Sequence, residues 1–326
     1  MNHSVSQNKS ANNALRAWGL QGDLSPLGDG HIHDTYRVST SGDDLVLQRV
    51  NEYVFKDGDL VMAQTRRVLD CWRQQEDYIC PELVTTPGGE DSARVDGQLW
   101  RVWRYLPNTQ VLDPIETPQQ VEAAAGAFAQ FQIRMQALEG PRLVDPISGF
   151  GRLNLYLRDF DKAPDAPQVL QQMIDSGRRL ADRFDTPTGV IHADCKVNNV
   201  LFNLSGSDVV AVIDFDTAMY GHWAWDFGDL VRSVCFSSGS YDSELFLACV
   251  RGFADHPHAD PEAFADAPAY VALMLGVRFL TDHLTGDDYF RVEEPGQNLA
   301  RAKEQLSLYT QFVSARAQMV QLASRS

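Results

Sequence analysis

Short runs of alternating apolar and polar residues fill the first hundred positions, and they predict the strands of a sheet. Residues 24–50 read as a glycine-rich hairpin followed by a strand at residues 45–50. The run LWRVWRYL at residues 99–106 predicts another strand, which Pro107 ends. Between these strands, residues 57–77 carry apolar side chains at helical spacing and predict one helix.

The pattern becomes mainly helical after residue 106. Residues 117–120, TPQQ, combine a capping box with a proline in the first turn, which is typical of a helix start. The apolar positions that follow recur every three or four residues and form one stripe, at Val121, Ala124, Phe128, Phe131, Met135 and Leu138. We interpret this stripe as core and not as a cofactor site. A later apolar run predicts a helix that begins near Pro268.

The stretch VIHADCKVNNVLFNLSGSDVVAVIDFD, at residues 190–216, predicts a polar loop and a hairpin. A pair of apolar residues precedes the loop, and a strand-like run at residues 200–202 follows it. A turn comes next, at residues 205–207. A second apolar run, at residues 209–213, then delivers Asp214 at its end. The loop and the end of the second strand therefore face one another.

The loop and Asp214 offer the residue types that phosphoryl transfer requires, because that reaction depends on positioning and on neutralisation of the triphosphate. Asp194 would accept the proton of a substrate hydroxyl, and Lys196 would lie beside the transferring phosphate. Asn199 and Asp214 would hold Mg²⁺ through oxygen atoms. The order H-x-D-x-K-x-x-N, from His192 to Asn199, matches the catalytic loop of protein kinases. The alternative is a polar turn in which Asp194 and Asn199 only satisfy backbone donors.

A second acidic tripeptide, Asp226-Phe227-Gly228, spells the metal-binding signature of protein kinases in the wrong context. It leads into an apolar run with helical spacing, whereas the metal-binding acid should close the hairpin. We expect Asp226 to cap that helix or to accept hydrogen bonds from the backbone of the catalytic loop. Asp216, just beyond Asp214, is a weaker candidate for the metal shell.

Backbone groups in two segments are candidates for binding ATP. Gly28 and Gly30 lie in the first hairpin, where the backbone can approach phosphates. The backbone of Arg104, Tyr105 and Leu106 would meet the edge of the adenine, in a hinge between two lobes. Tyr105 can instead be plain packing in that hinge, and the sequence does not separate the two roles.

The strand after the hairpin lacks the lysine that kinases usually place there. No lysine lies between Lys9 and Lys56, and Lys56 falls beyond the strand. We therefore expect Arg49 to supply the cation for the phosphates, with the amide of Gln48 as the alternative. The sequence does not identify a carboxylate partner for Arg49 on the next helix.

Composition and net charge narrow the kinds of molecule that the protein is expected to bind. The chain has 326 residues, of which 44% are hydrophobic, and a net charge of −16. This charge argues against nucleic acid and against anionic membranes, because both attract basic patches. The five cysteines are scattered without the spacing of a zinc site, the polar N-terminus does not resemble a signal peptide, and no segment is expected to span a membrane. We expect a cytoplasmic enzyme, monomeric or homodimeric.

These features together resemble the aminoglycoside phosphotransferase-like kinases, a superfamily that includes choline, homoserine and sugar kinases. The chain is most similar to the N-acetylhexosamine 1-kinase branch, whose members phosphorylate the anomeric hydroxyl of N-acetylhexosamines with ATP and magnesium. The segments that carry the resemblance are GHIHDTY (30–36), LQRVNEYVF (47–55), HADCKVNNVLF (192–202), VIDFDTAMYG (212–221), RFLTDHLTGDDYF (278–290) and NLARAKEQL (298–306). The resemblance implies that Asn199 and Asp214 hold the metal.

The resemblance also implies a sugar site formed by His31, Asp194, Arg278 and Tyr289. By themselves, Arg278 and Tyr289 would be read as a surface residue and a packing aromatic. The chain departs from the branch at residues 158–162, where RDFDK replaces a segment of the Asn-Phe-His-Asp type and lacks its histidine. If this segment touches the substrate in relatives, the specificity has changed here.

We therefore expect an α+β, two-lobed, protein-kinase-like fold. An N-lobe with a small antiparallel sheet would occupy residues 1–104, and a mostly helical C-lobe would occupy residues 105–326. The expected function is ATP-dependent phosphorylation of an N-acetylhexosamine of the GlcNAc or GalNAc type, with Asp194 as the base. The alternatives are a kinase of aminoglycosides, choline, homoserine or another sugar, and a non-catalytic nucleotide-binding regulator, which the missing lysine would fit.

Overall fold

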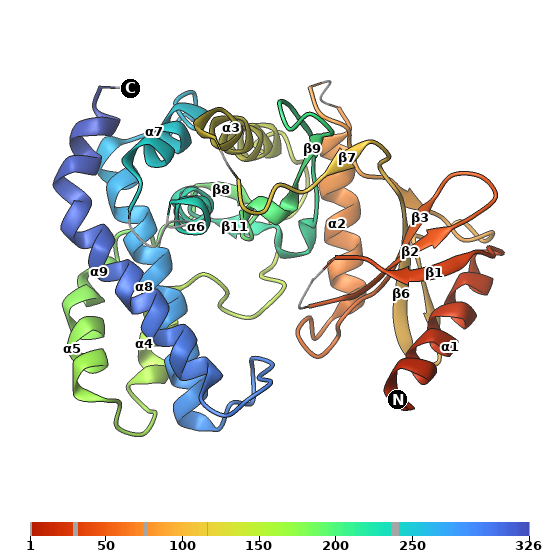
Figure 1. Ribbon diagram of the computed structural model, residues 1–326, viewed down its shortest axis with the longest axis horizontal. Coiled ribbons are helices and arrows are strands. Elements are labelled where there is room, and N and C mark those ends of the chain that lie inside the picture. Colours follow the sequence, from red (N-terminus) through yellow and green to blue (C-terminus); the bar gives the residue numbers. More distant parts are fainter. Residues whose placement is uncertain (1, 29–31, 75–76, 116, 236–240, 326) are drawn as a thin grey trace.

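The structure of the chain is a computed structural model that describes residues 2–28, 32–74, 77–115, 117–235 and 241–325. It has an N-terminal lobe built around an antiparallel sheet and a larger lobe that is mostly helical (Figure 1). The α+β, two-lobed, protein-kinase-like architecture expected from the sequence is thereby confirmed. The two ends of the chain lie at opposite ends of the molecule.

A six-stranded antiparallel sheet forms the body of the N-lobe. Its strands follow the order β1-β2-β3-β6-β4, and β5 pairs with β6 off this path. The strands are β1 (Asp23–Pro26), β2 (Asp34–Ser39), β3 (Leu45–Arg49), β4 (Leu83–Val84), β5 (Ser92–Val95) and β6 (Gln98–Arg104). β6 ends at Arg104, the residue at which the sequence places the end of the N-lobe, and the division into two lobes at this residue stays a prediction.

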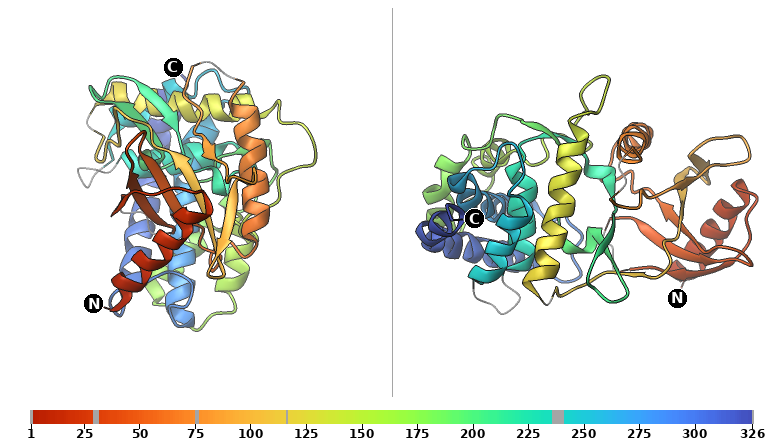
Figure 2. Two further views of the ribbon diagram at one scale, coloured as in Figure 1. Left: turned by 90° about the vertical axis from the view of Figure 1, so that its right-hand side faces the viewer. Right: turned by 90° about the horizontal axis from the view of Figure 1, so that it is seen from above.

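Two helices cover opposite faces of this sheet (Figure 2). α1 (Asn2–Ala17) lies on the outer face, far from the helical lobe. Leu45, Leu47 and Trp100 pack against α1 in an apolar cluster on that face. α2 (Gly58–Trp72) lies on the inner face, between the sheet and the helical lobe. Because side chains alternate along a strand, β3 and β6 present different residues to the two helices.

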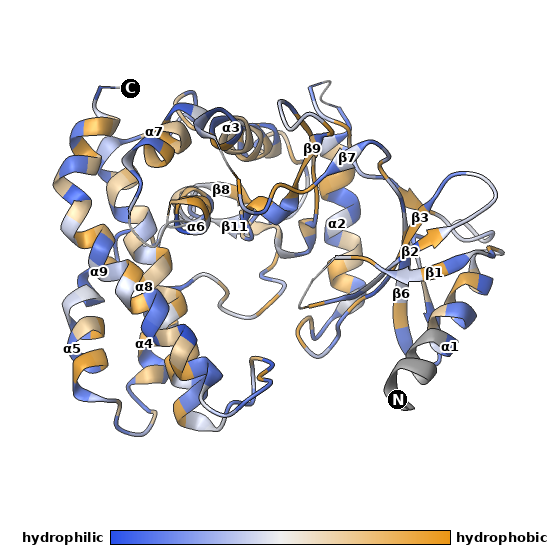
Figure 3. Cartoon of the chain, in the orientation of Figure 1, coloured by the Kyte–Doolittle hydropathy of each residue, from blue (hydrophilic) through white to orange (hydrophobic). Residues whose placement is uncertain are grey.

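The helical lobe surrounds one large hydrophobic core. Its helices are α3 (Pro118–Met135), α4 (Leu153–Phe160), α5 (Gln168–Gly177), α6 (Ala224–Val234), α7 (Ser243–Gly252), α8 (Pro261–Thr285) and α9 (Gln297–Ala323). α6 lies in the middle of this lobe, where hydrophobic and hydrophilic residues alternate along it and most of them are buried (Figure 3).

The start of α3 is the one that the sequence predicts. The Thr117 side chain accepts a hydrogen bond from Gln120 N, and the Gln120 side chain accepts one from Thr117 N, which completes the capping box. All of the apolar stripe predicted for this helix packs into the main core, so its interpretation as core is confirmed.

α8 differs from the sequence prediction in two respects. It begins at Pro261, where the Asp260 carboxylate accepts a hydrogen bond from Ala263 N, and Pro268 lies inside it. The cap and the proline in the first turn explain this earlier start. α8 is also long and apolar enough to cross a membrane, contrary to the expectation that no segment is. Its most apolar part is 83% buried inside the protein, as in the core helix of a globular protein.

Short strands place residues 190–216 at the centre of the molecule. They are β7 (Thr109–Gln110), β8 (Gly189–Ile191), β9 (Val200–Asn203), β10 (Val209–Val212) and β11 (Met219–Gly221), with 3-10 turns η1 (Arg178–Leu180), η2 (Val197–Asn199) and η3 (Phe215–Thr217). β9 pairs with β10 in the expected hairpin, and β11 pairs with β8. These two pairings bring the loop between β8 and β9 beside the turn between β10 and β11.

Candidate active site

Asp194 lies in the loop between β8 and β9, with two polar neighbours from the same loop. Lys196 Nζ donates to Asp194 Oδ2 at 2.8 Å, and Asn199 Nδ2 donates to the same oxygen at 2.9 Å. Burial alone would lower the pKa of Lys196, but the ion pair with Asp194 outweighs burial, and the pKa is raised. Lys196 is therefore a cation. Within the described residues no hydrogen bond is directed to Asp194 Oδ1, which leaves this oxygen for a substrate proton.

Asp226, at the start of α6, holds the backbone of this loop. Its Oδ2 accepts a hydrogen bond from His192 N at 2.8 Å, and its Oδ1 accepts one from Ala193 N at 2.7 Å. Gln132 Nε2 of α3 also donates to Oδ2 at 2.7 Å. Ala193 has a φ of 64°, in the left-handed region, so the carboxylate stabilises a backbone conformation that alanine rarely adopts. The expectation that Asp226 binds the loop backbone is confirmed.

Two contacts bring the end of β10 beside the loop. The buried His192 ring lies among three phenylalanine rings, and its Nε2 atom is 3.0 Å from the Ile213 carbonyl. Ile213 N in turn donates to the Asn199 carbonyl at 3.0 Å. Asp214 follows directly, with a φ of 66°. Asn199 and Asp214 are therefore close neighbours, as the predicted metal site requires.

The donor chemistry of this pair fits Mg²⁺. Asn199 uses its amide nitrogen on Asp194, which leaves its side-chain oxygen as a ligand. Burial, and then the nearby charge of Asp216, raise the pKa of Asp214. A divalent cation would offset both effects and keep Asp214 ionised. The metal role of the two residues stays a prediction that this arrangement supports.

Asp216 is already satisfied by protein groups. Arg101 of β6 donates to both of its carboxylate oxygens at 2.6 Å, and Thr65 Oγ1 of α2 lies 3.2 Å from Oδ1. Burial by itself would raise the pKa of Asp216, yet Arg101 and the hydrogen bonds from His33 and Arg101 hold it well below its usual range. The carboxylate therefore joins the sheet of the N-lobe to the turn that carries Asp214.

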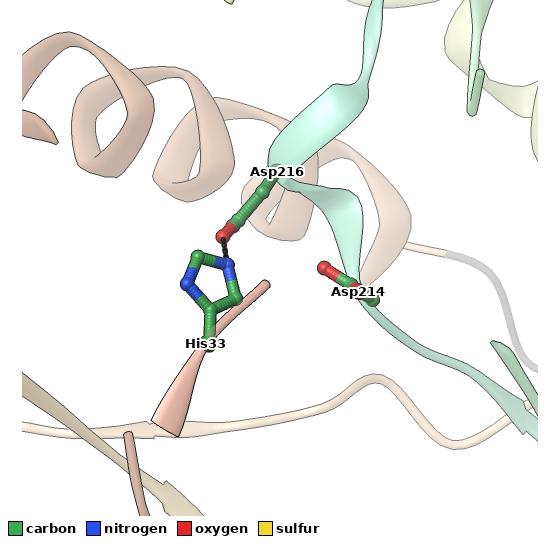
Figure 4. Close-up of side chains that lie close together, drawn as sticks. All are labelled: His33, Asp214 and Asp216. Carbon is green, nitrogen blue, oxygen red and sulfur yellow. Dashed lines mark hydrogen bonds and ion pairs between the residues drawn. The ribbon is translucent and has the colours of Figure 1, made fainter. Parts of the chain in front are cut away.

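His33, Asp214 and Asp216 offer ligand atoms that all lie within 4.8 Å of one another (Figure 4). The hydrogen bonds of His33 argue against its use as a metal ligand. Asn51 N donates to His33 Nδ1 at 3.1 Å, so that nitrogen carries a lone pair and the ring proton sits on Nε2. Nε2 lies 2.8 Å from Asp216 Oδ2, to which it donates. Of these three residues, Asp214 is the one left to bind a metal.

The inner face of the N-lobe sheet carries Gln48 and Arg101. Arg101 Nε and Nη2 donate to Gln48 Oε1 at 2.8 and 2.6 Å. Arg49, the expected phosphate-binding residue, has its side chain on the outer face, where it pairs with Asp34 and with Gln98. The physical reason is strand alternation, which puts Arg49 on the side of Leu45 and Leu47, facing α1.

Arg101 and His33 are absent from the sequence predictions. The available signal for Arg101 is its place in LWRVWRYL, between Leu99 and Trp103 on one face of a strand, where a charge must find a buried partner. His33 follows His31 in GHIHDTY, and the sequence offers no way to choose between the two. His31 and Gly30 lie outside the described residues.

The remaining nucleotide candidates are placed as follows. Gly28 has a φ of 71°, and a Cβ atom added there would meet nothing within 4 Å, so the backbone is open to a ligand. Arg104 N and Tyr105 N donate to the carbonyls of Glu82 and Asp44, and the Arg104 side chain is exposed. The Leu106 carbonyl accepts a hydrogen bond from Thr109 Oγ1. The role of residues 104–106 in binding adenine stays a prediction.

Arg278 and Tyr289 meet in one cavity of about 220 Å³ in the helical lobe. Arg278 Nη2 lies 3.4 Å from the Tyr289 hydroxyl, and its guanidinium group is surrounded by aromatic rings at 5.0–5.6 Å. The wall also includes Tyr156, Asp159, Asp282 and Phe290. Asp159 belongs to the RDFDK segment that departs from the resemblance. Asp194 is not part of this wall.

A series of hydrogen bonds links the cavity to the turn of Asp216. Asp282 accepts hydrogen bonds from Tyr289 N and Phe290 N at 2.8 and 3.0 Å, and this fixes the loop after α8. The preceding carbonyl, of Asp288, accepts one from the Tyr53 hydroxyl of the N-lobe at 2.8 Å. Tyr53 N donates to the side chain of Asn51, whose own N donates to His33. The loop that carries Tyr289 is therefore tied to the N-lobe.

Comparison with known sequences gives a family for most of the chain. A sequence model of the family described as "Phosphotransferase enzyme family" matches residues 23–266. The chain is also similar to the homoserine kinase of Caulobacter vibrioides, with 24% identity over 186 residues, which are 56% of this chain and 57% of that protein. The chain thus spans little more than half the length of this curated relative.

Solved structures share the fold over nearly the whole chain. A choline/ethanolamine kinase family protein from Mesorhizobium loti matches with a TM-score of 0.66 and 17% identity over 100% of both chains. An amicoumacin kinase in complex with AMP-PNP and Ca²⁺ matches with a TM-score of 0.67 and 15% identity, over 95% of this chain and 94% of that chain. At such low identities the likeness is one of fold.

Proposed function

Because this chain belongs to the phosphotransferase enzyme family, we propose that it transfers the γ-phosphoryl group of ATP to the anomeric hydroxyl of an N-acetylhexosamine. Membership makes it a small-molecule kinase that acts on a hydroxyl group, and kinase activity implies ATP. The identity of the acceptor rests on the resemblance of the motifs and on the cavity that Arg278 and Tyr289 share.

The loop residues have distinct tasks in this reaction. Asp194 Oδ1 accepts the proton of the acceptor hydroxyl as the oxygen attacks, while Lys196 and Asn199 hold the other carboxylate oxygen in place. Lys196 also presents positive charge toward the transferring phosphoryl group. Asn199 and Asp214 would hold Mg²⁺, which neutralises charge on the phosphates. Asp226 keeps the loop in this geometry through two backbone amides.

The observation that carries the choice of acceptor is the combination of polar and aromatic side chains that line the cavity. Its centre is the guanidinium group of Arg278, ringed by aromatic side chains. The wall also carries the carboxylate of Asp159, so it offers hydrogen-bond donors and acceptors beside the aromatic rings. Guanidinium donors and aromatic faces suit a neutral ring that carries hydroxyl and acetamido groups.

The direct test is ADP release from the purified protein with a panel of acceptors, which includes free N-acetylhexosamines, an aminoglycoside, choline and homoserine. Turnover with an N-acetylhexosamine, and a phosphate found by NMR on the anomeric oxygen, is the expected result. Turnover confined to choline or the aminoglycoside would contradict the proposal.

Free cysteines throughout the chain support the expected location in a reducing cytoplasm.

Homoserine is the second candidate acceptor, because the curated relatives are homoserine kinases. The cavity offers a guanidinium group for a carboxylate and the Asp159 carboxylate for an ammonium group, which together match an amino acid. The same panel separates the two candidates, because homoserine turnover without sugar turnover would favour this one.

Replacement of Asp194 tests the chemistry independently of the acceptor. We expect Asp194→Asn to lower ADP release by about 10²–10⁴-fold, because the amide cannot take a proton. The melting temperature should change little, since the amide oxygen still accepts from Lys196 and Asn199. Asp208→Asn, in the exposed turn between β9 and β10, is the matched control and should keep full activity. Unchanged activity of Asp194→Asn would show that another group is the base.

A further inference from the structure

α4 forms one wall of the cavity that Arg278 and Tyr289 share. Tyr156 and Asp159 lie three residues apart on this helix, so their side chains project from the same face. Both residues line the cavity. This wall is the part of the cavity where the sequence departs from the resemblance, because residues 158–162 read RDFDK.

The hydroxyl group of Tyr156 is buried beside the backbone N–H of Gly151, and none of the residues that the structure describes accepts its proton. Burial accordingly raises the pKa of Tyr156. The phenol ring lies beside the Arg278 guanidinium, 5.0 Å from its centre. Folded proteins rarely leave the proton of a buried hydroxyl without an acceptor, and at the wall of a cavity a ligand group can supply that acceptor.

Tyr270 provides a contrast in the same neighbourhood. Its hydroxyl donates to the Gly151 carbonyl at 2.8 Å and accepts from Leu153 N at 3.1 Å. Both of its hydrogen-bonding capacities are thus used to hold the start of α4. Tyr270 therefore has both a donor and an acceptor in the protein, whereas Tyr156 has no acceptor among the described residues.

Asp159 adds an acceptor for hydrogen bonds at the same wall. Its only partner within the described chain is Lys162, with Nζ at 3.0 Å from Oδ1, and both side chains are exposed. Exposed pairs of this kind contribute little and exchange readily with other partners. A carboxylate that faces a cavity accepts hydrogen bonds from two adjacent hydroxyl groups, which is the arrangement on a sugar ring.

We propose that Tyr156 and Asp159 determine acceptor specificity by binding hydroxyl groups of the acceptor through their side-chain oxygens. Arg278 and Tyr289 bind the acceptor in the same cavity. The proposal rests on the proposed function for the statement that this cavity receives the acceptor, here a polyhydroxylated ring. The resemblance raised a substrate contact only for residues 158–162 as a segment, and the proposal assigns specific contacts to Tyr156 and Asp159.

The test compares Tyr156→Phe with Tyr270→Phe, two variants that each lose one buried hydroxyl. Tyr156→Phe should raise the KM for the acceptor by on the order of tenfold, with kcat and the KM for ATP unchanged. Its melting temperature should stay level or rise, because the variant removes a buried hydroxyl whose proton has no acceptor in the described chain. Tyr270→Phe should lower the melting temperature and leave the KM for the acceptor unchanged.

Asp159 is tested with a graded pair of variants. Asp159→Ala should raise the KM for the acceptor, and Asp159→Asn should recover part of the loss, because its amide oxygen still accepts a hydrogen bond. Lys162→Ala is the matched control, since it removes the ion pair but leaves the carboxylate. It should leave the KM for the acceptor unchanged.

The proposal is overturned if Tyr156→Phe lowers the melting temperature as Tyr270→Phe does, or if the KM for the acceptor is the same in the wild type, Tyr156→Phe and Asp159→Ala. Failure of the proposed function is distinguishable, because it shows in the wild type as absence of turnover with N-acetylhexosamines. In that event the variants are assayed with the acceptor that the panel identifies, and the comparison of melting temperatures requires no acceptor.

Discussion

Asp216 and Asp226 are both buried carboxylates beside the candidate active site, and their surroundings are opposite in kind. Asp226 accepts hydrogen bonds from two backbone amides and the Gln132 side chain, all of which are neutral and belong to the helical lobe. Burial raises its pKa. Asp216 meets the guanidinium group of Arg101, which comes from the other lobe, and its pKa is held well below its usual range.

The two regions are accordingly held in place by different kinds of interaction. The catalytic loop is fixed within one lobe by hydrogen bonds that require no cation. The connection between the lobes at η3 relies on a charge pair whose side chains are each 1% exposed. A buried ion loses its solvation, so the loss of one partner leaves the other at high free energy. The two sites should therefore respond differently to mutation and to pH.

The largest expected effect is that of Arg101→Met. It leaves Asp216 buried without a cation, and removal of one partner of a buried pair costs about 3–5 kcal/mol in the free energy of unfolding. Urea denaturation monitored by tryptophan fluorescence measures this change. The double variant Arg101→Met with Asp216→Asn should recover part of the loss, because the uncompensated charge is then gone.

Arg49→Met is the matched control, since it removes an arginine from the outer face of the same sheet. Its partner Asp34 is about one-third exposed, so the expected loss is at most about 1 kcal/mol. Equal losses for Arg49→Met and Arg101→Met would remove the distinction between a buried and an exposed pair. A double variant less stable than Arg101→Met would show that Asp216 does not carry an uncompensated charge.

Asp226→Asn should have a smaller effect, of about 1–3 kcal/mol, because one of the three donors loses its acceptor and no charge pair is broken. ADP release should also fall, since the amides of His192 and Ala193 set the path of the loop. Urea denaturation and the ADP assay measure the two effects. A loss of stability larger than that of Arg101→Met would reverse the ranking of the two carboxylates.

The smallest expected effect is the pH dependence of the contribution that Asp226 makes to the free energy of unfolding. Because burial raises its pKa, the folded protein takes up a proton at a higher pH than the unfolded chain does. The stability of the wild type relative to Asp226→Asn should therefore rise as pH falls from neutral through the raised pKa. It should level off below the ordinary aspartate value of about 3.9. If the relative stability instead decreases as the pH is lowered, Asp226 is stabilised as an anion, as Asp216 is.

The catalytic loop could be predicted from the sequence because its geometry is local. Asp194, Asn199 and Asp214 lie in one loop and the hairpin that follows it, and the spacing of apolar runs fixes where each strand ends. The hydrogen bonds between Asp226 and the loop backbone could also be predicted. The helical spacing of the apolar residues after Asp226 showed that it does not stand at the end of a strand.

The cation of the inner sheet face could not be predicted in the same way. Alternation along β3 separates Arg49 from Gln48, but which face turns inward depends on where α1 packs. The ion pair of Arg101 with Asp216 joins residues 115 positions apart, and no local pattern specifies such a pair. The start of α8 was missed for a different reason, because Asp260 and Pro261 act as a cap ahead of the apolar run.

α2 determines where this chain can be divided into fragments. Several of its buried residues, among them Val68, Leu69 and Trp72, belong to the hydrophobic cluster of the helical lobe, and the Trp72 ring lies 5.6 Å from that of Phe131 in α3. A fragment that ended at Arg104 would expose this side of α2 to water, and its complement would lack one wall of its core. A chimaera with a relative should therefore exchange α2 together with the helical lobe. The two lobes are distinct in shape, but the unit that can be exchanged between relatives consists of the helical lobe together with α2.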